Sequence, residues 1–241
     1  MKSIGKYIFM LMSLFSKPEK YSMYWKETFR QMNNIGVGSL LIVGVISIFV
    51  GAVTAIQFAY QMEDSYLPTY MLGFIVRDTM IIELAPTLSS LVLAGKVGSN
   101  IASELGTMRI TEQIDALDIM GINSANYLIT PKLIAAILIV PPLIVIAAFL
   151  GIYGGFLSAQ MYGISPSLYR YGLLYMFDPF NGVIMLVKSV VFAFIITSVA
   201  CYEGFYVKGG AIEIAKASTR AVVNGSILVI LFDYILATLL T

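Results

Sequence analysis

Three ionisable side chains lie within stretches that are otherwise apolar enough to cross a membrane. Glu83 is in the segment IIELAP, just before Pro86, whereas Lys188 is in VKSVVFA and Asp233 is in LFDYIL. An ionisable group near the middle of a bilayer costs roughly 2.5–3.5 kcal/mol on insertion scales, so it normally faces protein or water. We therefore expect these residues either to form a structural ion pair, such as Glu83 with Lys188, or to line a hydrated passage.

The composition excludes several other kinds of chemistry. The chain has no histidine and a single cysteine, which excludes Ser-His-Asp and Cys-His catalytic groups and an internal disulfide, and argues against a metal site. No stretch matches G-x-x-x-x-G-K-[ST], because the Gly95-Lys96 pair lacks the upstream glycine and the following Ser or Thr. Any ATP that drives this protein must be hydrolysed by another chain. The net charge of +1 gives no indication of nucleic-acid binding.

A polar, helix-forming run, AGKVGSNIASELGTMRITEQIDALDIM from Ala94 to Met120, separates two apolar stretches. Its spacing predicts two short helical pieces, with Gly106 allowing another backbone to approach and Thr111 as the N-cap of the second piece. Three acidic residues would then share one face: Glu112, Asp115 and Asp118. By spacing alone, this face fits a solvated acidic surface as well as a docking surface for a soluble partner.

The elements that position these residues are predicted to be membrane helices. Hydrophobic residues make up 59% of the chain and charged residues only 12%, against about 25% charged in soluble proteins. A spanning helix needs about 20 mostly apolar residues. Five stretches qualify, at about 35–60, 70–93, 133–160, 182–202 and 221–240. We therefore predict an all-α integral membrane fold, with residues 1–241 as a single domain and residues 31–241 as its transmembrane region.

Two sequence features concern packing of the third span. Pro141-Pro142 predicts a kink, because an interior proline removes a helical hydrogen bond. Gly151 and Gly155 form a G-x-x-x-G pattern, which is typical of close helix contacts. For this pattern we favour packing within the chain over contact between two copies.

Residues 1–30 predict an interfacial helix and a linker. The segment MKSIGKYIFMLMSLFSKPEK has only about ten apolar residues between lysines, as in a signal peptide, but no A-x-A-like cleavage site follows. An apolar stripe at helical spacing is formed by Ile4, Ile8, Leu11 and Phe15. We therefore favour an amphipathic helix on the cytoplasmic leaflet over a cleaved signal.

The basic residues predict the orientation, because cytoplasmic connections are rich in Lys and Arg. With the N-terminus in the cytoplasm, all but three of the 15 Lys and Arg residues fall on the cytoplasmic side. The exceptions are Arg77 and Arg170 outside and Lys188 within a span. The connections at Ala94–Lys132 and Tyr202–Arg220 are therefore predicted to be cytoplasmic and the C-terminus extracytoplasmic.

Within the polar run, SELGTMRITEQIDAL closely resembles the signature of the MlaE/YrbE-type permeases. These are the membrane subunits of ABC transporters that move lipids between membranes of the bacterial envelope and of chloroplasts. The resemblance extends from about Arg30 to the C-terminus, and it implies that residues of about 97–121 form a coupling helix in a groove of the ATPase. The positions that match the motif most closely are Glu104, Gly106, Arg109, Thr111, Glu112 and Gln113.

The resemblance also implies a lipid pathway and an assembly. Family segments like those around Glu83 and Lys188 line a cavity between two copies, and we group Asp233 with them as a pathway residue. The implied partners are a second copy of the chain, a cytoplasmic ATPase dimer that binds ATP and Mg, and an extracytoplasmic MCE-type lipid-binding protein, all at the bacterial inner membrane. The sequence departs from the family pattern at Ile82, where many relatives carry a basic residue, and at Asn181, where some carry an acidic one.

Two other functional classes remain open at this stage. An ion- or proton-coupled secondary transporter would use Glu83, Lys188 and Asp233 as a relay, although the sequence shows no convincing internal repeat of the kind common in that class. A membrane scaffold would recruit a soluble partner through the same cytoplasmic helix. Co-purification of an ATPase favours the ABC transporter, and lipid in the same sample separates a transporter from a scaffold.

Overall fold

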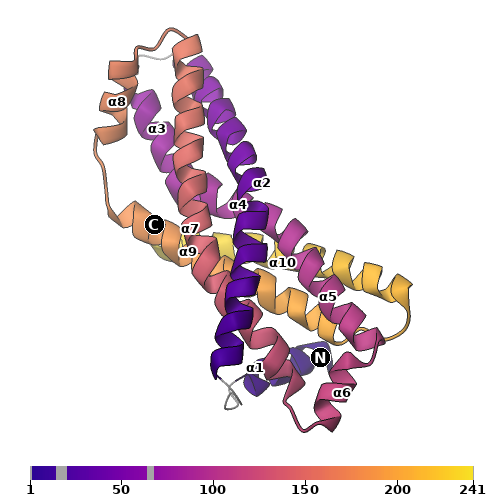
Figure 1. The fold of residues 1–241 in the computed structure, drawn as a ribbon. Coiled ribbons are helices and arrows are strands. Elements are labelled where there is room, and N and C mark those ends of the chain that lie inside the picture. Colours follow the sequence, from indigo (N-terminus) through magenta and orange to yellow (C-terminus); the bar gives the residue numbers. More distant parts are fainter. Residues whose placement is uncertain (1, 15–20, 64–67, 241) are drawn as a thin grey trace. The chain divides into compact units, whose positions relative to one another are not determined.

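The computed structural model describes residues 2–14, 21–63 and 68–240, and these residues form helices joined by short connections (Figure 1). In chain order the helices are α1 (Lys2–Ser13), α2 (Tyr21–Glu63), α3 (Met71–Thr79), the π-helical turn η1 (Met80–Leu84), α4 (Ala85–Leu93), the π-helical turn η2 (Ala94–Gly98), α5 (Ser99–Ile110), α6 (Gln113–Ile119), α7 (Ser124–Met161), α8 (Pro166–Leu174), α9 (Phe180–Phe205) and α10 (Ala211–Leu240). Over the described residues, five helical segments are long and apolar enough to cross a membrane. The prediction of an all-helical fold with five spans is confirmed.

The helices extend well beyond the apolar stretches that predict them. α2 begins at Tyr21 rather than at about 35, and α7 begins at Ser124 rather than at about 133. The first span covers 40 residues, a contour of about 60 Å at 1.5 Å per residue, against a hydrocarbon thickness of about 30 Å. Apolar composition marks the part of a helix that lipid can surround, whereas the backbone hydrogen bonds continue into the polar flanks.

The second span is continuous with much of the polar run that follows it. A single candidate span covers Met71–Ile110 and includes η1 and η2. The helix therefore continues past residue 93, where the sequence predicts that the span ends, and α5 is its last part. Only α6 forms a separate short helix after it. Proline explains the first wide turn, since Pro86 has no N–H and its ring would clash with the Ile82 carbonyl. Ala85 instead donates its backbone N–H to the Met80 carbonyl, the wider π pattern.

The chain folds as two compact units that divide the long helices between them. Unit 1 comprises Met1–Ser39, Ser90–Val140 and Val190–Ile235, and unit 2 comprises Leu40–Ser89, Pro141–Ser189 and Leu236–Thr241. One boundary falls at Pro141, where the sequence predicts a kink, although α7 is helical through both prolines. The kink and the single-domain organisation stay predictions.

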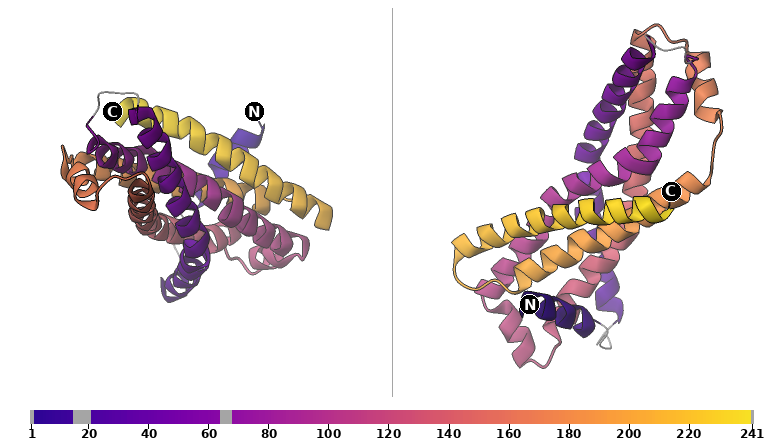
Figure 2. Two further views of the ribbon diagram at one scale, coloured as in Figure 1. Left: turned by 90° about the horizontal axis from the view of Figure 1, so that it is seen from above. Right: turned by 180° about the vertical axis from the view of Figure 1, so that it is seen from behind.

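In unit 1, α1 packs against α9 (Figure 2). The Tyr7 hydroxyl lies 2.8 Å from Ser198 Oγ, and the Tyr7 ring meets Tyr202 edge to face. Burial raises the pKa of Tyr7, and the hydrogen bond with Ser198 offsets part of that rise. Met10 is buried on the same face of α1, whereas Ile8, on the predicted apolar stripe, is exposed. The side chains of Ile4 and Phe15 lie outside the described part of the chain.

Close backbone contacts hold unit 2 together. A Cβ atom at Gly51 would overlap the Gly151 carbonyl, and one at Gly154 would overlap the Ile48 carbonyl. Glycine is therefore required where α2 and α7 cross, and the G-x-x-x-G region packs within the chain, as predicted. α3 and α8 meet in the same way at Gly73 and Gly172.

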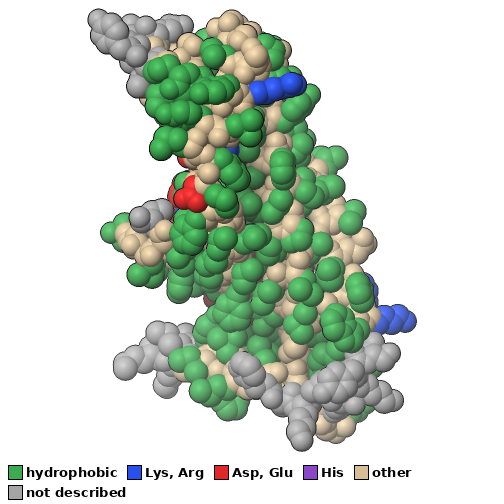
Figure 3. Space-filling view, turned by 90° about the vertical axis from the view of Figure 1, so that its left-hand side faces the viewer, with side chains coloured by type: hydrophobic (Ala, Val, Ile, Leu, Met, Phe, Trp, Pro, Cys, Tyr) green, Lys and Arg blue, Asp and Glu red, His purple; other side chains and the backbone are tan. Residues whose placement is uncertain are grey.

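Arg77 anchors the connection that follows α8 in unit 2. Its side chain is buried, and Nη1 and Nη2 donate to the carbonyls of Leu173, Tyr175 and Met176. Asp78 accepts from Nε at 2.7 Å and supplies the opposite charge. The outer surface remains largely apolar, since hydrophobic side chains cover much of the face drawn in Figure 3. Large exposed examples include Leu41 and Phe149, which suits contact with lipid.

Candidate functional site

The structure brings Glu83 and Lys188 together inside unit 2. Lys188 Nζ donates to Glu83 Oε2 at 2.8 Å. The two partners are buried to very different extents, because the Lys188 side chain is 0% exposed and the Glu83 side chain is 46% exposed. The predicted ion pair therefore forms, with the ammonium enclosed by protein and the carboxylate presented at the surface of the unit.

Local structure fixes both partners of this pair. Glu83 lies on the wide turn η1 that Pro86 imposes. Lys188 lies on α9, next to the buried Ser189, whose hydroxyl donates to the Leu186 carbonyl at 2.7 Å. A carboxylate held in this way offers acceptor oxygens at the level of a membrane span. It can therefore interact with hydroxyl or ammonium groups of a polar lipid headgroup.

Asp233 does not share a unit with this pair. It is buried in α10, within unit 1, whereas Glu83 and Lys188 belong to unit 2. The buried face of α10 recurs every fourth residue and consists of Ala217, Ala221, Gly225, Val229 and Asp233. Asp233 thus continues a buried stripe along α10 whose other members are Ala, Gly and Val. Neither unit by itself contains the three residues of the predicted relay.

The connection between α5 and α6 differs from its predicted capping. Thr111 ends α5, and its hydroxyl donates back to the Thr107 carbonyl at 2.9 Å, so it does not cap α6. A hydroxyl inside a helix can bond to the carbonyl four residues earlier, which competes with capping. Glu112 occupies the cap position of α6 instead, in the left-handed conformation with φ 58°. Gln113 Nε2 donates to Thr111 Oγ1 at 3.0 Å across this break.

The predicted acidic face of the second helical piece does not form as a continuous surface. Glu112 lies outside α6, and Asp115 accepts from Arg109 Nη1 at 2.7 Å, which ties α6 to the end of α5. Asp118 is exposed. On the inner side, Ile114 is fully buried. Of the predicted coupling set, Glu104 on α5 and the turn formed by Thr111, Glu112 and Gln113 are exposed.

Gly106 and Glu104 face elements other than that turn. A Cβ atom at Gly106 would lie 3.4 Å from side-chain atoms of Val207 and Ile214. The close approach predicted at Gly106 is thus made by side chains. The backbone contact of α5 occurs at Gly204, where an added Cβ would lie 2.7 Å from the Ala102 carbonyl oxygen. Glu104 Oε2 accepts from the buried Lys132 Nζ at 2.6 Å.

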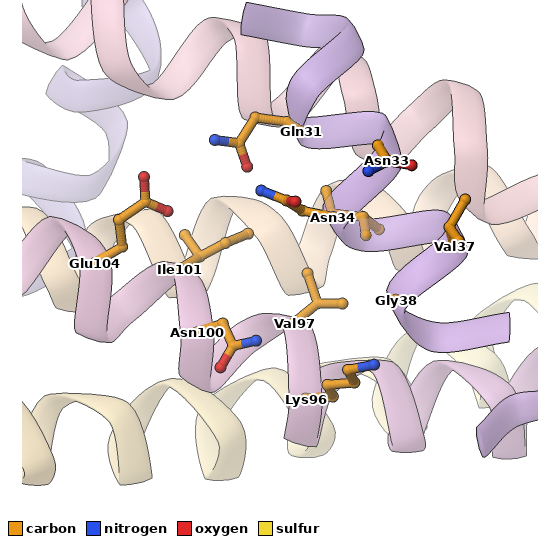
Figure 4. A pocket seen from close by; sticks show the side chains of 11 residues that line it. Gln31, Asn33, Asn34, Val37, Gly38, Lys96, Val97, Asn100, Ile101 and Glu104 are labelled. Carbon is orange, nitrogen blue, oxygen red and sulfur yellow. The ribbon is translucent and has the colours of Figure 1, made fainter. Parts of the chain in front are cut away.

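A polar groove of about 450 Å³ lies between α2 and the helix η2–α5 in unit 1 (Figure 4). Polar side chains at helical intervals line it, namely Gln31 and Asn34 on α2 and Lys96, Asn100 and Glu104 on the facing helix. This groove was not predicted from the sequence. Lys96, Asn100 and Glu104 are four residues apart, which indicates one polar helix face. The sequence does not indicate that this face lies opposite α2, because that contact depends on tertiary structure.

The chain is similar to known proteins over almost its full length. The family model described as Permease MlaE matches residues 28–239. A probable ABC transporter permease protein of Rickettsia bellii is 36% identical over 239 residues, covering 99% of this chain and 92% of the relative. The intermembrane phospholipid transport system permease protein MlaE of Haemophilus influenzae is 30% identical, with the same coverage. The chloroplastic protein TRIGALACTOSYLDIACYLGLYCEROL 1 of Arabidopsis thaliana is 33% identical over 91% of this chain and 63% of its own length.

Proposed function

The chain belongs to the MlaE permease family, and on that premise we propose that it moves phospholipid or a related lipid between membranes of the cell envelope. It is the permease subunit of an ABC transporter and not itself the ATPase. The observation that carries this proposal is the family match over residues 28–239, which includes all five candidate spans except the first few residues of α2. The family match supports an ABC transporter permease and supports neither alternative class, the secondary transporter or the membrane scaffold.

The assembly we propose contains two copies of this chain, a cytoplasmic ATPase dimer with ATP and Mg, and an extracytoplasmic MCE-type lipid-binding protein. Five spans per chain are few for a complete transport pathway, which favours a homodimer. The intermembrane transport named for the Haemophilus relative requires a component that carries lipid beyond the membrane. We place the assembly in the bacterial inner membrane.

The distribution of basic residues supports the proposed topology. Of the 15 Lys and Arg residues, only Arg77, Arg170 and Lys188 fall in the sequence ranges of unit 2. The other basic residues fall in the ranges of unit 1, so the rule of cytoplasmic positive charge favours cytoplasmic connections at Ala94–Lys132 and Tyr202–Arg220. The N-terminus is then cytoplasmic and the C-terminus extracytoplasmic.

We assign α1 to the cytoplasmic membrane interface. One of its faces carries Tyr7 and Met10 and packs on unit 1, while Ile8, Phe9 and Met12 are exposed. Exposed apolar side chains beside a helix that is already docked suit the boundary between headgroups and acyl chains.

The ATPase is proposed to bind the break between α5 and α6 and the tip of α6. Thr111, Glu112 and Gln113 are exposed there, and Ile119 is 87% exposed at the end of the same short helix. Glu104 and Gly106 would help to hold this surface in place through contacts within unit 1. Glu104 pairs with Lys132, and Gly106 packs near Val207 and Ile214.

The lipid pathway is proposed to pass the Glu83 carboxylate. The enclosed Lys188 ammonium holds this carboxylate at the surface of unit 2, where it can accept hydrogen bonds from a headgroup. Asp233 stays a predicted pathway residue.

Reconstitution tests this function. The chain and its ATPase, purified together and placed in vesicles, should transfer a fluorescent phospholipid to acceptor vesicles only with ATP. Omitting the ATPase should abolish the transfer. Equal transfer without ATPase or ATP would contradict the proposed function.

A further inference from the structure

The polar groove has a composition that a surface in contact with acyl chains does not have. Its walls lie inside the candidate spans Met23–Met62 and Met71–Ile110. Asn34 and Asn100 present amides, and Lys96 presents an ammonium, within these spans. Polar and charged side chains at such positions normally face water or a polar ligand. The groove is therefore suited to water or to a polar ligand.

The charged side chains that line the groove differ in whether they have an ion-pair partner. Glu104 bonds to Lys132 Nζ at 2.6 Å, and Gln31 donates to Glu27 Oε1 at 2.8 Å. Among the residues that the structure describes, no carboxylate lies within ion-pair distance of Lys96. One positive charge therefore remains available in the groove, and the amides of Asn34 and Asn100 are neutral donors in the same lining.

The shape of the groove brings this ammonium close to the α2 backbone. A Cβ atom at Gly38 would lie 3.6 Å from Lys96 Nζ, so the absence of a side chain there leaves the space beside the amine open. Figure 4 shows Asn34 on α2 and Asn100 on the facing helix along the same groove. An ammonium and amide N–H groups in the lining of one groove are suitable donors for the oxygens of a phosphate group.

Apolar residues complete an amphipathic site. Ile35, Val97 and Ile101 form buried parts of the lining, and Val37 on its rim is 69% exposed. A ligand that fits both parts carries a phosphate next to a hydrocarbon chain. We propose that the groove binds the phosphate of a glycerophospholipid in the cytoplasmic leaflet, with Lys96 as its counter-charge. This inference rests on the proposed function and topology, and it concerns a site separate from Glu83 and Lys188.

The test uses the full chain purified with its ATPase in detergent, with native mass spectrometry to count bound ligands. The probes are dioctanoyl phosphatidylglycerol, dioctanoylglycerol without phosphate, and inorganic phosphate. The wild type should bind the phosphate-bearing lipid more tightly than either other probe. Lys96→Gln should weaken its binding about tenfold, which corresponds to about 1.4 kcal/mol, and Lys96→Arg should restore it to within about threefold. Asn100→Leu should also weaken binding, and the exposed Lys26→Gln in the same unit is the control.

Several results would overturn the inference. The groove would not recognise phosphate if Lys96→Gln bound dioctanoyl phosphatidylglycerol as tightly as the wild type does. The same conclusion would follow if the wild type bound dioctanoylglycerol as tightly as dioctanoyl phosphatidylglycerol. Equal binding of inorganic phosphate would indicate a site for soluble anions. Dissociation of a dimer by Lys96→Gln, without lipid binding in the wild type, would identify the groove as a contact between copies. Lipid transfer between vesicles separates the proposed transport function from the proposed groove site. If the wild type transfers lipid and Lys96→Gln still binds lipid normally, the groove site is contradicted and the transport function is not.

Discussion

At the scale of single residues, the unequal burial of Glu83 and Lys188 decides how the pair responds to mutation. Lys188 is fully enclosed, whereas the Glu83 carboxylate is half-exposed. Removing the carboxylate takes from the enclosed ammonium the partner that lies 2.8 Å away. Removing the ammonium leaves a carboxylate that water can reach. The ion pair therefore stabilises the enclosed Lys188, while the Glu83 carboxylate stays accessible from outside the protein.

We expect Glu83→Leu to lower the stability of the purified chain by about 3 kcal/mol, because the fully enclosed Lys188 ammonium loses a direct ion-pair contact. Lys188→Met should cost about 1 kcal/mol or less, because solvent screens the remaining carboxylate. Thermal unfolding in detergent measures both effects. The double variant should regain most of the stability and still transfer little lipid. Equal stability of the two single variants would contradict the asymmetry, and transport restored in the double variant would show that the pair is only structural.

At the scale of elements, the break between α5 and α6 is the most distinctive local feature of the candidate ATPase surface. Glu112 adopts a left-handed backbone there, which is uncommon for residues other than glycine and asparagine. The Arg109–Asp115 ion pair and the buried Ile114 hold α6 in place. The side chain of Glu112 therefore projects from a turn whose position is fixed by its neighbours.

Glu112→Lys should leave the chain inserted and folded but reduce recovery of the ATPase in a pull-down at least tenfold, because it reverses a charge on the proposed contact. Glu112→Gly is the matched control, since glycine readily adopts positive φ. It should keep the turn and weaken association less than the lysine variant. Normal recovery of the ATPase with Glu112→Lys would show that the contact lies elsewhere.

The sequence predicted the existence of the spans better than their ends. Apolar composition located all five, but it missed the first turns of α2 and α7, whose polar residues form the same backbone hydrogen bonds. Thr111 was misplaced because a threonine can cap a helix or bond back within one, and only the fold selects between them. The Glu83–Lys188 pair was anticipated because charges in apolar stretches are few. The polar groove was missed because its two walls are about 60 residues apart in sequence.

At the scale of the whole molecule, the proposed orientation can be tested by cysteine labelling from outside the cell. The obvious probe at the C-terminus, Thr241, lies outside the described residues, and Ser124 is too buried for reliable labelling. Ser167 in unit 2 and Met120 in unit 1 are exposed. With Cys201 replaced by alanine, an impermeant maleimide should label Ser167→Cys and not Met120→Cys. The reverse pattern would refute both the orientation and the ATPase surface.

The division of the long helices between two units has a consequence for synthesis of the chain. Unit 1 uses residues from the first helix through Ile235, so its last segment leaves the ribosome when almost all of the 241 residues have been made. At about 5–20 residues per second, translation takes roughly 12–50 seconds. During that interval the helices that are made first are in the membrane before the later segments of their own unit have been made. A stop codon or a stalled ribosome late in the message would therefore leave both units incomplete, and such fragments should be substrates for membrane proteases.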